Sequence, residues 1–130
     1  TPKPSSAASD VYKRQLYEDC AFLEAWPGVP VGNEEGEIIS AALGDKRAIL
    51  LSHHGQLSTG ASIEEACVIA QLIERAAKLQ LLAMAAGTIK PILPELGREA
   101  HDWISKPKRH SAAFNYYARQ NLKKHADCLN

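Results

Sequence analysis

The sequence predicts an α/β domain in which a partial sheet is backed by one long helix. The segment Arg47–Ser52 reads RAILLS, a short and nearly continuous apolar run of the kind expected for a strand covered on both faces. Ser62 and Glu65 form a capping box, in which each side chain can satisfy the other residue's amide. We expect the helix that follows to run to about Ala86 and to end at Gly87. A strand followed by a long capped helix is typical of an α/β fold.

Three further elements surround this pair. Residues 16–31 mix apolar and acidic positions before a Pro-Gly-Val-Pro segment, which predicts a short strand and a turn. Asn33 can cap a helix of about ten residues that ends at Gly44, because glutamates follow it where the helix dipole favours them. Two peripheral helices are predicted, one beginning near Pro94 and one capped by Ser111 and running to about Lys124.

The predicted long helix is apolar over most of its circumference. Ile63, Ile73 and Leu81 lie on one stripe, while Leu72 and Leu82 widen it. A helix of this kind is expected to be buried on more than one side. Cys67 lies in its interior and is expected to be an inert, small apolar residue.

Residues 1–15 are rich in Pro, Ser and Ala and have no apolar periodicity, so we expect them to be unstructured. The run PSSAASDVYKRQ also resembles a translated sequencing adaptor, which would make it an artefact. Under this interpretation the folded domain occupies residues 16–130.

Composition excludes several classes of function. With 130 residues and 45% hydrophobic content, the chain can bury the core of one modest domain. Fifteen basic and fifteen acidic residues give zero formal net charge, which argues against nucleic acid or an anionic membrane as a partner. Three widely spaced cysteines without a Cys-x-x-Cys pair favour a reducing cytoplasm, and no apolar run approaches the roughly 20 residues of a membrane span.

The strongest chemical signal is the His53-His54-Gly55 triplet at the end of the predicted strand. An imidazole at a strand end suits a metal ion, because the backbone fixes the ring while its lone pair faces an open cleft. Since side chains alternate along a strand, the two histidines are expected to point to opposite faces, and only one can serve a given metal. Gly55 would allow a close approach of backbone or substrate. From the triplet alone, buried or hydrogen-bonded structural histidines are the more common outcome.

The surrounding residues resemble the class II aldolase/adducin family. Its recurrent pattern is an apolar strand, a His-Gly pair, a turn with glycine, and Glu-Glu-Ala in a long helix. This pattern matches Leu50–Gly55, Thr59-Gly60 and Glu64-Glu65-Ala66. The resemblance implies a partial three-layer α/β/α, aldolase/epimerase-like domain that is truncated at the amino terminus, with residues 16–130 as its carboxyl-terminal part. It also implies that His54, the histidine before the glycine, is a zinc ligand and that His53 is not.

The same resemblance implies a function. Members are zinc-dependent enzymes that cleave, epimerise or decarboxylate small hydroxy-carbonyl compounds, sugars or sugar phosphates, through an enediolate, and they form homo-oligomers. The family's upstream His-x-His pair and acid/base glutamate have no match among these residues, so we expect the chain alone to be inactive. The alternative is a non-catalytic, adducin-like assembly module.

Other candidates are more simply explained by packing. Tyr116 and Tyr117 are weak catalytic candidates, because carboxyl-terminal tyrosines in this family sometimes donate a proton from a neighbouring subunit. Trp26 and Trp103 are expected to be packing anchors. The cluster Lys106–His110 could meet a phosphate or nucleic acid, but a solvated turn between helices is the favoured interpretation.

Overall fold

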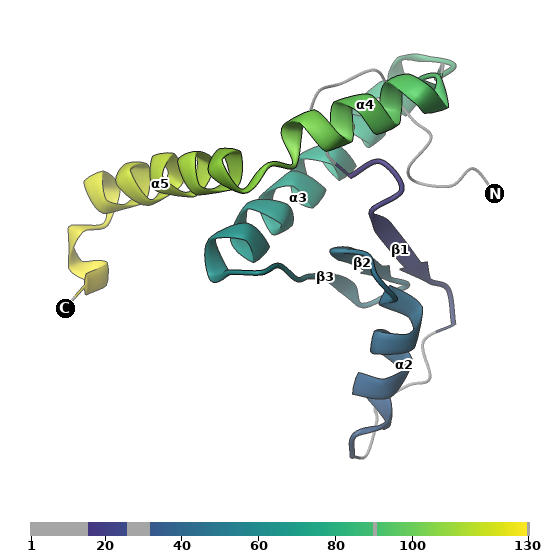
Figure 1. The fold of residues 1–130 in the computed structure, drawn as a ribbon, viewed down its shortest axis with the longest axis horizontal. Helices are drawn as coiled ribbons and strands as arrows, with labels where there is room; N and C mark the ends of the chain where they lie inside the picture. Colours follow the sequence, from purple (N-terminus) through teal and green to yellow (C-terminus); the bar gives the residue numbers. More distant parts are fainter. Residues whose placement is uncertain (1–15, 26–31, 90, 130) are drawn as a thin grey trace.

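A computed structural model describes residues 16–25, 32–89 and 91–129 of the chain (Figure 1). Residues 1–15 and Trp26, on which two of the predictions above depend, lie outside the described residues. The helices and strands of the described part are, in order, β1 (Cys20–Leu23), α2 (Glu34–Leu43), β2 (Ala48–Leu51), β3 (Gly55–Ser58), α3 (Ile63–Ala86), α4 (Pro94–Ile104), α5 (Pro107–Lys124) and the 3-10 helix η2 (Ala126–Leu129). None of the described helices is long and apolar enough to cross a membrane.

The three strands form one sheet in the order β1-β2-β3, so β2 is central. β1 runs parallel to β2, with Leu23 opposite Leu51, and β3 runs antiparallel to β2, with Gly55 opposite Leu51. β3 is absent from the predicted elements. Its sequence, GQLS, contains one apolar residue, and its strand conformation comes from hairpin pairing with β2 rather than from a local pattern.

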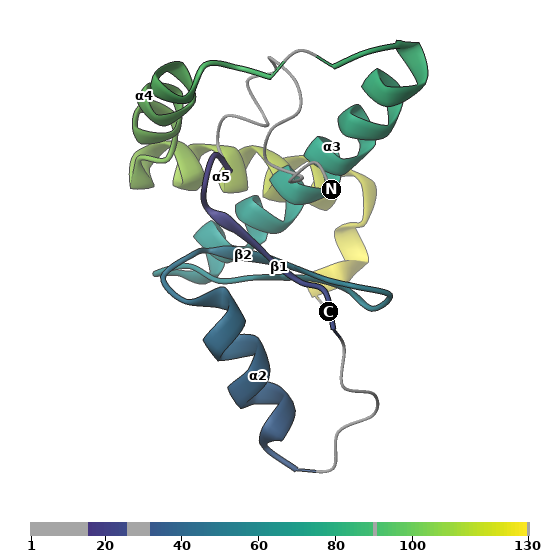
Figure 2. The ribbon, with the colours of Figure 1, turned by 90° about the vertical axis from the view of Figure 1, so that its right-hand side faces the viewer.

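Two helices cover opposite faces of the sheet, with α3 on one side and α2 on the other (Figure 2). On the α3 face, Ala48 packs in a cluster with Val68, Ile69, Leu72 and Ile73. On the α2 face, Ile49 and Leu51 pack against side chains of α2. The prediction of a strand buried on both faces and the predicted α/β/α layering are therefore confirmed.

The predicted ends of α3 are confirmed, and its cap differs in one bond. The Ser62 hydroxyl accepts from the Glu65 amide at 3.2 Å, but the Glu65 carboxylate accepts from the Ala61 amide, at 2.8 Å, instead of from Ser62. Gly87 ends the helix with a φ of 142°, a backbone conformation that residues with a side chain rarely adopt.

The prediction that α3 is buried on more than one side is confirmed for its first half, which packs against the sheet and also against Ala113, Phe114 and Tyr117 of α5. Its fully buried residues are confined to its first half, where the helix lies on the sheet. The second half extends beyond the sheet, which leaves Leu81, Leu82 and Met84 exposed (Figure 2).

Helix α5 begins at Pro107, earlier than the predicted cap at Ser111. Proline suits the first helical position because its φ is already helical and that position needs no donor. Residues 107–110 therefore form the first turn of a helix, and His110 is buried, with 4% of its surface exposed. This corrects the interpretation of Lys106–His110 as a solvated turn, although Lys106, Lys108 and Arg109 are exposed.

Candidate functional site

His53 and His54 lie in the turn that joins β2 to β3, not on the strand itself. β2 ends at Leu51, and the amide of His54 donates to the Leu51 carbonyl at 3.1 Å to close the turn. His53 adopts a positive φ of 60°. The argument from side-chain alternation along a strand therefore does not apply to these two residues, and both are exposed.

β3 starts at Gly55, where the backbone conformation, and not a lack of space, favours glycine. Its φ is 156°, which residues with a side chain rarely adopt, but a Cβ built on it would meet nothing within 4 Å. No backbone of the described chain comes close to this Cβ position, and the expected close approach of a substrate stays a prediction. The glycine instead lets the chain reverse directly after the two histidines, which keeps them at the carboxyl end of the buried central strand.

The described residues do not form a metal site by themselves. No three His, Cys, Asp or Glu side chains gather to hold an ion within residues 16–25, 32–89 and 91–129. A catalytic zinc normally needs three protein ligands, so the predicted ligand, His54, would provide one of them. A shallow surface hollow beside the first turns of α2, lined by residues such as Asn33, Glu35 and Glu37, contains neither histidine.

The two tyrosines lie on α5, which packs along α3. Tyr117 contacts the apolar cluster on that face of the sheet, and the Arg75 guanidinium lies 5.2 Å from its ring centroid. Tyr116 is exposed and meets Tyr117 edge to face, with ring centroids 5.7 Å apart. Trp103 is also exposed, with Lys106 and Arg109 over its ring at 4.7 and 4.8 Å, so within the described chain it is not a buried anchor.

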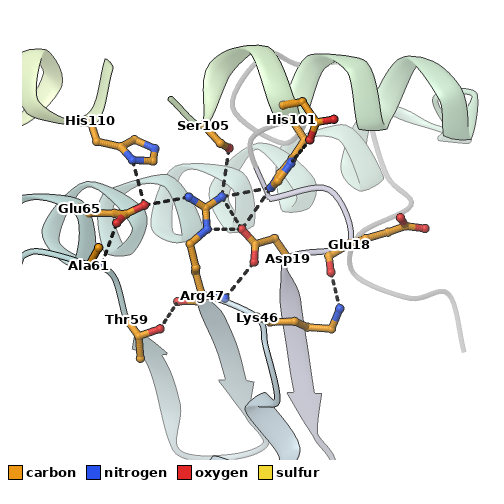
Figure 3. A network of polar contacts seen from close by, with 11 residues as sticks. Glu18, Asp19, Lys46, Arg47, Thr59, Ala61, Glu65, His101, Ser105 and His110 are labelled. Atoms are coloured by element: carbon orange, nitrogen blue, oxygen red, sulfur yellow. Dashed lines mark hydrogen bonds and ion pairs between the residues drawn. The ribbon is translucent and has the colours of Figure 1, made fainter. Parts of the chain in front are cut away.

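At the other end of the sheet, Arg47 is the centre of a network of polar side chains (Figure 3). Arg47 directly precedes β2 and Asp19 directly precedes β1, so the parallel pairing brings them together. The Arg47 amide donates to Asp19 Oδ1 at 2.9 Å, and its guanidinium forms an ion pair with the same carboxylate. Because His54 follows β2, the two sites lie at opposite ends of one strand.

Side chains from three helices complete this network. The Arg47 guanidinium donates to Glu65 of α3 and to Ser105, just after α4, each at 3.0 Å. His101 Nε2 of α4 lies 3.2 Å from Asp19 Oδ2 and 3.1 Å from the guanidinium. His110 Nδ1 of α5 lies 3.3 Å from Glu65 Oε1 and has no hydrogen-bond partner among the described residues.

The charges shift one another's pKa values in opposite directions. Burial alone would raise the pKa of Asp19, but hydrogen bonds from His101 and Arg47 outweigh it and lower that pKa to about 2. The hydrogen bond to Asp19 raises the pKa of His101, while burial lowers the pKa of His110 against the opposing charge of Glu65. Burial also acts to raise the pKa of Glu65, yet the Ala61 amide and Arg47 lower it overall.

Sequence reasoning missed this network because its members are far apart in the chain. Arg47 lies 28 positions from Asp19 and 54 from His101. The available signal was a charged residue near the start of each strand: Arg47 opens the predicted strand 47–52, and Asp19 lies within residues 16–31, where the other strand was predicted. Parallel pairing of those strands would have placed the two side chains together.

Comparison with known proteins matches the family description "Class II Aldolase and Adducin N-terminal domain" to residues 5–81. The chain belongs to the class II aldolase and adducin family. The matched region contains β1, the histidine turn and most of α3. It begins inside the segment that the sequence predicts to be unstructured.

Relatives in this family have different names. The chain is 30% identical over 107 residues to the decarboxylase NovR of Streptomyces niveus, a match that covers 76% of this chain and 40% of the relative. It is 32% identical over 83 residues to a 4-hydroxy-3-prenylphenylpyruvate oxygenase/4-hydroxy-3-prenylbenzoate synthase of Streptomyces roseochromogenus subsp. oscitans, with 64% and 30% covered.

A solved structure shows the same fold. The L-fuculose 1-phosphate aldolase from Glaciozyma antarctica PI12 superposes with a TM-score of 0.78 at 26% identity, covering 95% of this chain and 48% of that one. The chain thus spans half or less of the length of these relatives. Because their names include an aldolase, a decarboxylase and an oxygenase, family membership does not fix the reaction.

Proposed function

We propose that this chain is part of a metal-dependent lyase in which His54 is a ligand of a divalent metal ion. The proposed ion is zinc. The observation that carries the proposal is the exposed His54-Gly55 turn at the carboxyl end of buried β2, inside the region matched to the family. The turn is closed by its own backbone hydrogen bond, so the position of this imidazole depends on the central strand of the sheet.

The other ligands and the acid/base group must then come from outside the described residues. One imidazole cannot retain zinc against water and buffer, and the described part offers no set of three ligands. Under this proposal, residues 16–130 are the carboxyl-terminal part of the domain, and the chain by itself has no activity.

The proposed substrates are small hydroxy-carbonyl compounds, sugars or sugar phosphates, and the proposed reactions are aldol cleavage, epimerisation or decarboxylation. Support comes from relatives named as an L-fuculose 1-phosphate aldolase and a decarboxylase. We further propose a cytoplasmic homo-oligomer. Three free cysteines agree with a reducing compartment, and the exposed apolar side chains of α3 and α4 agree with contacts between subunits.

The second candidate function is an adducin-like assembly module without catalysis. Large apolar residues exposed on α3 and α4, among them Leu82, Met84 and Trp103, favour a role in binding other proteins. This reading requires no complete metal site.

The complete gene and its protein distinguish the metal-dependent lyase from the adducin-like assembly module. For the lyase, the sequence before Leu16 in the genome should encode a His-x-His pair and a glutamate, and the full protein should cleave a hydroxy-carbonyl phosphate in a chelator-sensitive manner. For the module, the upstream histidines should be absent and the full protein should show no turnover with added zinc. A full protein with the histidine pair but chelator-resistant turnover would contradict the metal-dependent reading.

A further inference from the structure

Helix α4 is held to the rest of the described chain mainly by polar contacts. It contributes no residue to either apolar cluster of the described part. Its inner face packs Gly97 closely against the Tyr17 ring and presents His101 to Asp19 and Arg47. On its outer side, Leu96 and Trp103 are exposed. With little apolar burial at this contact, the docking of α4 depends on the charges of the side chains that meet there.

We propose that the Arg47 network is a pH-dependent clasp, which holds α4 against the ends of β1 and β2 while His101 is protonated and releases α4 when His101 loses its proton. The parts of the clasp come from three segments of the chain. Asp19 and Arg47 precede the two strands, while His101 and Ser105 come from the end of α4. Figure 3 shows these side chains converging on the Arg47 guanidinium.

The charge balance explains why His101 is the switch. With His101 protonated, its charge and that of Arg47 balance the carboxylates of Asp19 and Glu65. Deprotonation leaves one uncompensated negative charge and removes the ion pair between α4 and Asp19. Two other charged groups adjoin His101. The Arg47 guanidinium lies 3.1 Å from Nε2, and its like charge opposes the protonation of His101. Asp102, 3.0 Å from Nδ1, is exposed and belongs to α4 itself, so it cannot hold α4 to the sheet.

Other charged groups nearby do not replace His101. Arg98 of α4 meets Glu18 at 3.4 Å, but both side chains are more than half exposed, so solvent screens this pair. Lys46 donates to the Glu18 carbonyl and does not contact α4 in this network. His110 faces Glu65 and Arg47, and burial lowers its pKa whereas that of His101 is raised, so His110 loses its proton at lower pH than His101.

The direction of the pH effect follows from linkage. The pKa of His101 is raised in the folded state above its ordinary value of 6.5. The stabilisation is therefore fully present below that ordinary value and is lost as the pH rises through the raised pKa. The clasp is closed on the acidic side of this range and open on the alkaline side.

Hydrogen exchange measured by mass spectrometry on this chain tests the clasp. Between about pH 6 and about pH 9, after correction for the intrinsic exchange rate, α4 amides should lose protection while amides of the first half of α3 keep theirs. His101→Gln should show low α4 protection at both pH values. His125→Gln, which changes a histidine outside the network, should behave like the wild type.

Two results would overturn the proposal. One is that, in the wild-type chain, the hydrogen-exchange protection of α4 does not change with pH relative to that of α3. This comparison needs only the wild type, so it is informative even when a variant fails to fold. The other is a folded His101→Gln variant that keeps the pH dependence of the wild type.

Discussion

Replacing Asp19 with asparagine removes the carboxylate on which Arg47 and His101 converge. The pKa of Asp19 is about 2 against an ordinary 3.8, and one pH unit of difference corresponds to about 1.4 kcal/mol. The charged carboxylate therefore stabilises the fold by about 2 kcal/mol at neutral pH. Its side chain is only 11% exposed, so solvent screening reduces this value little. We expect Asp19→Asn to lower the free energy of unfolding by about this amount.

The sign of the pH dependence is fixed by the lowered pKa. The stabilisation is present above the ordinary value of 3.8 and is lost as the pH falls towards about 2. In urea unfolding followed by far-UV circular dichroism, the wild type should therefore have a larger free energy of unfolding than Asp19→Asn at neutral pH. This difference should disappear in strong acid. Asp102→Asn is the matched control, since Asp102 also meets His101 but is 81% exposed, and it should change stability by less than about 0.5 kcal/mol. Equal stabilities of the two variants at neutral pH would refute the reasoning.

Two further predictions concern the chain as a whole. Deleting residues 1–15 should leave the thermal stability unchanged, because no apolar pattern indicates that they pack; a loss of more than about 1 kcal/mol, measured by thermal unfolding, would show that they do. The isolated chain should associate through the exposed apolar side chains of α3 and α4 and should show no zinc-dependent cleavage of hydroxy-carbonyl phosphates. Sedimentation combined with a zinc-supplemented aldolase assay checks both parts, and a monodisperse monomer with turnover would contradict them.

The parts of the fold that depend on local sequence could be predicted. The RAILLS run identified the central strand, and the Ser62 and Gly87 signals located both ends of α3, since burial patterns and caps are encoded by neighbouring residues. The start of α5 was misplaced because Ser111 is also a good cap, whereas the burial of His110 against Glu65 is a tertiary effect. The exposure of Leu81 and Met84 likewise depends on where α3 leaves the sheet.

The two candidate sites also differ in how far local sequence could predict them. His54 could be selected because its neighbours form a contiguous motif, although its place in a turn rather than on a strand was not foreseen. The Arg47 network could not be assembled from local patterns. Its members are joined only after β1 pairs with β2 and α4 docks, and no spacing rule connects Asp19 to His101.

The central claim is that His54 binds a catalytic metal ion, and the metal content of the complete protein tests it most directly. Zinc should be measured by elemental analysis after dialysis in the wild type, in His54→Ala and in the matched neighbour His53→Ala. We predict that His54→Ala loses its zinc and its turnover, while His53→Ala retains more of both, because three protein ligands are needed to hold the ion. Equal zinc in the wild type and in His54→Ala would contradict the assignment.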